Sequence, residues 1–169
     1  MTVKDEMRRW GAFGAVMFVT RVLSGLVWAN GAFEKPPPAF GWFPGWIDKE
    51  IAYGSIRPYQ WFLVNVLKPH LTFFGYVQFA TELFLGIVVT LGILVGLTSL
   101  LATFWAANIA LGSYPVPGEV LYYLAFFVLV PLILATGRAG RFGGLDATIR
   151  PRLLGSSNPW VRRLGEWGT

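Results

Sequence analysis

Long apolar stretches separated by short polar and proline-rich segments dominate the pattern along the chain. Residues 12–33 form the first stretch, and the prolines at 36–38 end it because proline cannot continue a helix. Residues 71–113 contain one charged side chain, Glu82, and the glycines at 92 and 96 divide this stretch in two. A helix that spans the hydrocarbon core needs about 20 apolar residues. The pattern therefore predicts four membrane-spanning helices, at about 12–33, 72–91, 97–112 and 119–136.

The segments between and after these spans have a different pattern. Residues 39–70 are rich in aromatic residues, proline and glycine, and two stretches, 46–53 and 57–67, have the spacing of short amphipathic helices that lie on a membrane surface. The aromatic side chains of this loop are expected to be interfacial anchors: Trp42, Phe43, Trp46, Tyr53, Tyr59 and Trp61. The tail 137–169 is basic and is expected to contain one short helix at about 147–154.

Composition supports a membrane protein and narrows the classes of function. Apolar residues make up 54% of the 169 residues and charged residues 14%, against about 45–50% and 25% in soluble domains. A single soluble domain of this length cannot bury so much apolar surface, which excludes a soluble enzyme, a nucleic-acid binder and a disordered chain. We therefore expect one membrane domain over residues 1–169. Its predicted fold is all-α and integral to the membrane: a four-transmembrane-helix bundle with short surface helices in the first external loop.

Charge predicts how the chain is oriented. The net charge is +5, and arginines concentrate near both ends, whereas the loop at 113–118 has no Lys or Arg. Cytoplasmic flanks of membrane helices accumulate Lys and Arg. Both termini, including the basic tail 137–169, are therefore expected to be cytoplasmic, in a prokaryotic plasma membrane, with the basic tail meeting anionic lipid headgroups.

The residue types available limit the chemistry of the chain. It has no cysteine and one histidine, His70, so we expect no disulfide and no metal or redox cofactor held by this chain alone. His70 follows Pro69 at the start of the second span. Two interpretations stay open for it: an interfacial side chain, or a ligand to a haem or chlorin of a neighbouring chain.

Arg21 and Glu82 are the charged side chains deepest in the predicted spans. Counted from opposite faces of the membrane, at 1.5 Å per residue, both lie about 15 Å deep, which is the middle of a core about 30 Å thick. Because an unpaired charge there is costly, we expect the two side chains to be close together. A structural ion pair that fixes helix register and a proton or quinone site are both consistent with this position.

Other polar side chains predict a pocket around this pair. Gln78 precedes Glu82 by one helical turn and shares its face, and Asn30 and Asn108 lie in the outer halves of the first and third spans. Trp28 and Trp105 are expected near the pocket wall. A quinone headgroup needs one or two hydrogen-bond donors in an apolar slot, which these residues supply. Hydrogen bonds that hold the helices together explain the same residues equally well.

Several motifs resemble one family of membrane proteins. The first span contains the sequence RVLSGLVW at 21–28 and NGAFEK at 30–35, the second has TELFLG at 81–86, and the fourth ends in TGRAGR at 136–141, followed by GLDA at 144–147. In this order the motifs resemble the DoxX superfamily of four-span proteins, and most closely its DoxD branch, the small-subunit type linked to thiosulfate:quinone oxidoreductase. The resemblance covers about residues 16–149. It implies a four-helix bundle and a membrane partner that passes electrons from a sulfur donor to quinone.

Two functions from different classes follow. In the first, the chain is the membrane subunit of a quinone-linked oxidoreductase, with Arg21 and Glu82 as candidate catalytic residues and the other pocket residues around the quinone. In the second, it is a non-catalytic accessory subunit of a larger respiratory or photosynthetic complex, and its aromatic side chains contact a partner subunit or a pigment. Both functions place the chain in the lipid bilayer with other membrane subunits and without nucleic acid. A small transporter is a third, weaker alternative.

Overall fold

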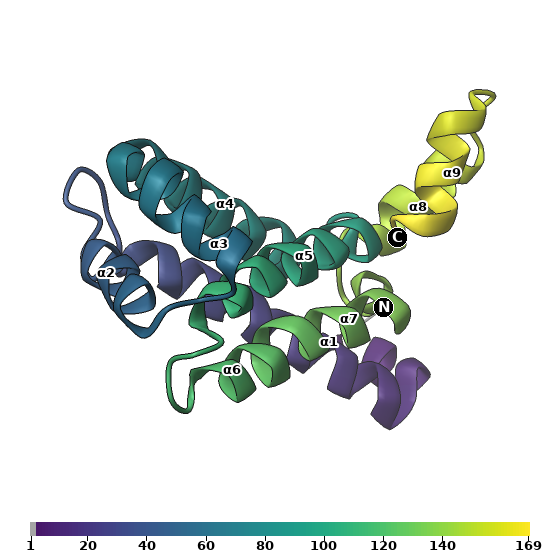
Figure 1. Ribbon diagram of the computed structural model, residues 1–169. Helices are drawn as coiled ribbons and strands as arrows, with labels where there is room; N and C mark the ends of the chain where they lie inside the picture. The colour runs from purple at the N-terminus through teal and green to yellow at the C-terminus, as the bar shows by residue number, and fades with distance from the viewer. Residues whose placement is uncertain (1–2) are drawn as a thin grey trace.

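A computed structural model describes residues 3–169, with side chains from Gly11 onward, and these residues form helices and turns without a β-strand. Four helical segments of the described chain are long and apolar enough to cross a membrane. They are Gly11–Phe33 of α1 (Val3–Phe33), the run Arg57–Leu91 that ends in α4 (Leu71–Leu91), α5 (Val95–Ser113) and the run Glu119–Thr136. The predicted all-α bundle of four spans is confirmed, and the predicted second span agrees within two residues with α4, the last part of its run. Figure 1 shows the four segments running alongside one another.

Two of the helical runs contain a wider π-helical segment directly before a proline. In the fourth span, α6 (Glu119–Tyr122) is followed by the π segment Tyr123–Leu129 and then by α7 (Val130–Thr136), which contains Pro131. A proline ring clashes with the carbonyl four residues earlier in a regular α-helix. That carbonyl belongs to Phe127, inside the π segment, whose wider turn gives the ring room. The π segment Leu63–Leu67 precedes Pro69 in the same way.

The first loop contains the two short helices that the sequence predicts. α2 (Phe43–Tyr53) is followed by α3 (Arg57–Phe62), which continues through the π segment to Lys68–His70 and then into α4. The backbone of His70 is not helical (φ −115°, ψ 33°), and the rings of Phe62 and Phe74 meet at 5.7 Å. The chain therefore folds back at His70, and α3 packs beside the first turns of α4.

The closest helix packing in the bundle is between α1 and α4. A β-carbon at Gly86 would lie 2.7 Å from the amide nitrogen of Ala29, so the backbones approach too closely for a side chain there. Small residues allow such approaches between membrane helices. The outward faces of the spans are apolar, including Phe104, Leu121 and Phe126, each more than 60% exposed. Exposure of such a large apolar surface to water is unfavourable, so these faces of the bundle are suited to contact with lipid.

Two buried charges hold the turn between α4 and α5. Arg21 of α1 donates to the carbonyls of Val89 and Thr90, at the end of α4, and to those of residues 142 and 143. Asp146 accepts from the amide of Leu94 at 2.6 Å and from that of Val95 at 2.8 Å, which satisfies the first amides of α5. We call Arg21, Asp146 and these main-chain groups the turn cluster. Gly92 completes the turn with a left-handed backbone (φ 73°).

The basic tail forms a helical hairpin. α8 (Asp146–Leu154) confirms the short helix predicted at about 147–154, and a second helix, α9 (Pro159–Trp167), packs against it. Gly165 of α9 lies against Leu153 and Leu154 of α8. Figure 1 shows the hairpin projecting from the end of the bundle at which α5 begins.

Candidate functional site

A cavity of about 470 Å³ lies at the opposite end of the bundle from the turn cluster. Its walls come from the end of α1, from α2 and α3, from the first half of α4, from α5 and from the start of the fourth span. Most of the lining is aromatic or aliphatic, and the polar atoms converge from different helices. Ligand pockets for small molecules have volumes of about 300–1,000 Å³ and this kind of lining.

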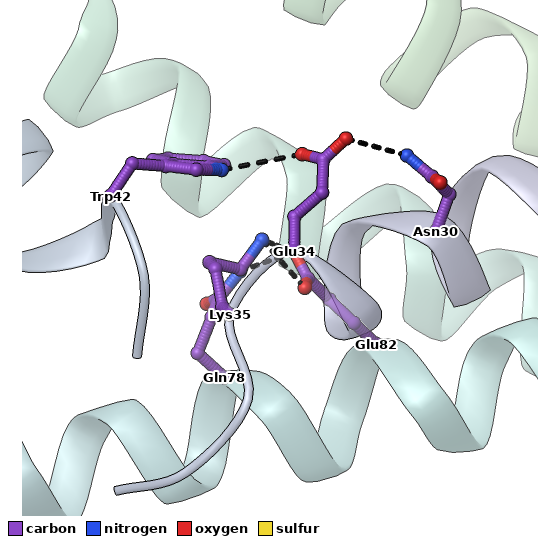
Figure 2. Close-up of polar contacts among 6 residues, drawn as sticks. All are labelled: Asn30, Glu34, Lys35, Trp42, Gln78 and Glu82. Carbon is purple, nitrogen blue, oxygen red and sulfur yellow. Dashed lines mark hydrogen bonds and ion pairs between the residues drawn. The ribbon is translucent and has the colours of Figure 1, made fainter. Parts of the chain in front are cut away.

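A buried ion pair lies at the cavity wall. The ammonium of Lys35 is 2.8 Å from one carboxylate oxygen of Glu82 and 3.0 Å from the other, and both side chains are more than 90% buried. The side-chain amide of Gln78 donates to the same carboxylate at 2.7 Å. Figure 2 shows Gln78 and Glu82 of α4 meeting Lys35, which lies just after the end of α1. The Glu82 carboxylate is therefore paired and hydrogen-bonded at a site shielded from water.

A second layer of polar contacts lies above this pair. Glu34 accepts a hydrogen bond from the amide of Asn30 at 2.7 Å and another from the indole of Trp42 at 3.2 Å (Figure 2). The ring of Trp42 also lies 4.4 Å from the Lys35 ammonium, a cation–π distance. Trp42 is therefore a half-exposed cover over Lys35, held in place by Glu34.

Glu50 brings a second buried carboxyl group to the cavity, from α2. It accepts from the hydroxyl of Ser113 and from the indole of Trp46, both at 2.9 Å, and it is 3% exposed. Burial raises the pKa of Glu50 to about 7, although both hydrogen bonds act in the opposite direction. At neutral pH this carboxyl is therefore able to hold or release a proton.

The far wall of the cavity supplies hydrogen-bond donors. Trp105 lines the cavity, and its indole nitrogen is buried and has no hydrogen-bond partner. Asn108 and Tyr59 line the same cavity. Trp28 is 2% exposed and packs edge-to-face against Phe127 at 5.2 Å, which makes this wall rigid. A buried donor without a partner is costly, so Trp105 is the clearest place for an acceptor atom of a ligand.

The predicted pocket residues are brought together as the sequence analysis expected, with one exception. Five of them line the cavity beside Glu82: Trp28, Asn30, Gln78, Trp105 and Asn108. The predicted pairing of Arg21 with Glu82 is wrong, because Arg21 binds the last turn of α4, and Thr90 lies eight residues, about 12 Å of helix, beyond Glu82. The depth estimate assumed that the two spans start level with the two membrane faces, whereas α1 continues past the α4–α5 turn toward its own N-terminal end.

Two polar side chains that complete the site, Lys35 and Glu50, were not predicted. Both lie outside the predicted spans, and so neither was expected to be a buried charge. One signal was present for Glu50, since Trp46 precedes it by one helical turn and donates to it. Several aromatic side chains predicted as membrane anchors also point inward, and Trp42, Phe43, Trp46 and Tyr59 line the cavity.

His70 lies away from the site. Its Nδ1 is 2.8 Å from the carbonyl of Val66, one turn earlier, and its side chain is exposed. Among residues 11–169, no group of three or more His, Cys, Asp or Glu side chains is arranged to hold a metal ion. The groups that line the cavity are the hydrogen-bonding side chains and the aromatic rings described above. Comparison with protein-family models, with curated proteins and with solved structures finds no match to this chain.

Proposed function

We propose that the chain is the membrane subunit of a quinone-linked oxidoreductase and that the cavity binds the quinone headgroup. The observation that carries the proposal is the cavity wall itself, in which Trp105, whose indole N–H is buried and unpartnered, lies among other aromatic rings. A quinone ring is flat and apolar, and its two carbonyl oxygens are acceptors. The donors of Trp105 and Asn108 suit one carbonyl, and the aromatic walls suit the ring.

One buried carboxyl group, that of Glu50, exchanges the protons that this chemistry needs. A quinone becomes a quinol by taking up two electrons and two protons. Glu50, whose pKa is raised to about 7, is the group that exchanges protons at neutral pH. The Lys35–Glu82 pair keeps fixed charges next to the ring, so that the negative charge that develops on a reduced oxygen is stabilised by Lys35. The electrons come from a partner subunit, and the DoxD resemblance favours thiosulfate as their source.

The proposed orientation places the termini in the cytoplasm of a prokaryotic cell. The tail lies at the end of the bundle at which α5 begins. It carries six arginines, as is typical of cytoplasmic flanks, at 138, 141, 150, 152, 162 and 163. The cavity lies at the other end of the bundle and therefore opens toward the outer face of the plasma membrane. A donor on that side would reach the quinone without crossing the membrane.

Binding of a short-chain quinone to the purified chain tests the headgroup site directly. Isothermal titration calorimetry in mild detergent should give a dissociation constant that rises about fivefold to tenfold in Trp105→Phe, which removes one hydrogen-bond donor and leaves a smaller aromatic ring. Trp160→Phe makes the same chemical change on α9, far from the cavity, and should leave the constant unchanged. Equal quinone affinity in the original chain and both variants would contradict a headgroup site at Trp105.

Quinone reduction by native membranes tests whether the chain is a subunit of an oxidoreductase. Native membranes that contain the chain should reduce quinone with thiosulfate, and Glu82→Gln should abolish that reduction. Unchanged turnover in Glu82→Gln contradicts the proposal. Mass spectrometry of the complex purified in mild detergent identifies the partners. A small extramembrane partner with bound quinone supports the oxidoreductase, whereas a large pigmented or haem-bearing assembly supports the accessory subunit.

A further inference from the structure

The last helix, α9, has two opposite faces of different chemistry. Trp160, Leu164 and Trp167 lie on one face and are 71%, 42% and 78% exposed, so no other part of the described chain covers them. Arg162 and Glu166 are exposed on the other side of the helix, and Arg163 is exposed at the edge of the apolar face. The side of α9 that faces α8 is a third one, formed around Gly165. An amphipathic helix with tryptophan and leucine opposite arginine is typical of helices that lie in a membrane interface.

The position of α9 in the fold places it at the membrane boundary. The amide of Gly96, in the first turn of the third span, donates to the carbonyl of Gly168 at 2.9 Å. Arg138 and Arg141, just after the fourth span, donate to the main-chain oxygen of Thr169. The end of α9 is thus fixed to the points at which two spans leave the membrane, and the exposed side chain of Trp167 lies next to them.

The charges of the hairpin are complementary to lipid phosphate. Arg152, Arg162 and Arg163 are exposed on the hairpin, with Glu166 the one exposed acid within residues 146–169. The guanidinium of Arg163 lies 5.4 Å from the ring of Trp160, so a basic group sits directly beside the apolar face. A headgroup bound there would meet the arginine while the tryptophan ring enters the acyl region, the depth that tryptophan prefers.

We infer that α9 lies in the membrane interface, inserts Trp160, Leu164 and Trp167 into the adjoining lipid leaflet and binds anionic lipid headgroups through Arg162 and Arg163. The inference needs only the four-span fold and is independent of the quinone site. In lipid, the α8–α9 hairpin is a lateral extension of the bundle along the membrane surface. It adds a contact with phospholipid to a chain that is already anchored by its spans.

The absence of cysteine from the chain makes the test specific, because one introduced cysteine carries the only label. The full chain is reconstituted in nanodiscs of phosphatidylglycerol or of phosphatidylcholine. Leu164→Cys, on the apolar face, and Glu166→Cys, on the polar face, each receive an environment-sensitive fluorophore. Quenching is measured with lipids that carry a nitroxide at the top of the acyl chain, and with acrylamide in water.

In phosphatidylglycerol, the label at 164 should lose most of its emission to nitroxide lipid and little to acrylamide, and the label at 166 should behave in the opposite way. In phosphatidylcholine, or in phosphatidylglycerol with Arg162→Gln and Arg163→Gln added, lipid quenching at 164 should fall. Equal lipid quenching at 164 under all of these conditions overturns the role of anionic headgroups. A label at 164 that acrylamide reaches overturns insertion. Shielding from both quenchers overturns it as well and indicates a protein that covers this face.

Discussion

The two ends of the bundle both bury charged side chains, but they satisfy them differently. In the turn cluster, Arg21 and Asp146 bind main-chain carbonyls and amides, and the space around them is filled. At the other end, the cavity cluster, which we define as Lys35, Glu82 and Glu50, is satisfied by side chains around an open volume. The same kind of residue is therefore used for two purposes.

The difference teaches which buried charges a ligand is able to use. Main-chain groups at a helix end do not move without unwinding the helix, so the turn cluster fixes the architecture. Side chains change rotamer and exchange partners at a smaller cost. The charges of the cavity cluster are consequently able to respond to a ligand, and they are the ones whose removal should affect binding more than folding.

Loss of Arg21 should have the largest effect on stability. Arg21→Met removes the guanidinium donor from buried main-chain carbonyls, including that of Thr90, and leaves Asp146 without a nearby positive charge, which should cost about 5 kcal/mol. Thermal unfolding in detergent measures the loss. Arg21→Lys, which keeps the charge without the branched guanidinium, should lie between Met and the original protein. A variant Arg21→Met that unfolds like the original would remove the distinction between the two ends.

Neutralising the ion pair in the cavity should be tolerated far better than breaking it. Lys35→Met leaves the Glu82 carboxylate buried and unpaired, at a cost of about 4 kcal/mol. The double variant Lys35→Met with Glu82→Gln has no buried charge at this site and keeps an acceptor for Gln78. Its free energy of unfolding should therefore lie within about 1 kcal/mol of that of the original chain. The quinone affinity of the double variant should remain lower than that of the original chain. If the double variant is as unstable as Lys35→Met, the cavity charges are as architectural as Arg21.

The carboxyl of Glu50 should make stability depend on pH at the cavity end. Its pKa is raised from an ordinary value of 4.5 to about 7, so the folded chain holds the proton more tightly than the unfolded chain does. The contribution of Glu50 to the free energy of unfolding is largest below pH 4.5. It declines by about 3 kcal/mol as the pH rises to about 7. Glu50→Gln should flatten unfolding temperatures measured across this range.

Asp48→Asn is the matched control for this series, since Asp48 is an exposed carboxylate on the same helix. It should leave the decline between pH 4.5 and 7 intact. A decline that persists in Glu50→Gln would assign the titration to another group.

The spans were predictable because their signal is local and strong. Runs of apolar residues of sufficient length, ended by the prolines at 36–38 and divided at Gly92, identify each span without knowledge of its neighbours. α9 escaped prediction although Asn158 and Pro159 form a helix-start signature, and the Asn158 side chain indeed accepts from the amide of Trp160. Trp160, Leu164 and Trp167 also have helical spacing, but the segment is only nine residues long, so its signal is weaker than that of a span.

The candidate site was predictable only in part, because part of it depends on register. Helical spacing places Gln78 beside Glu82, and similar depth places Asn108 and Trp105 near them. The partner of Glu82 depends on how far α1 slides along α4, which is fixed by contacts such as Gly86 against Ala29. No spacing within one span contains that information, and so Lys35 was missed and Arg21 was assigned to the wrong end.

The turn cluster also has a consequence for biogenesis. Arg21 lies close to the middle of the first apolar stretch, Gly11–Phe33, where an arginine costs about 2.5–3.5 kcal/mol on insertion. Its carbonyl partners are 68 to 122 residues later in the chain. During synthesis the first span therefore leaves the ribosome long before its partners exist. Its first partners, Val89 and Thr90, become available only when the second span has been made, and the others only after the last span.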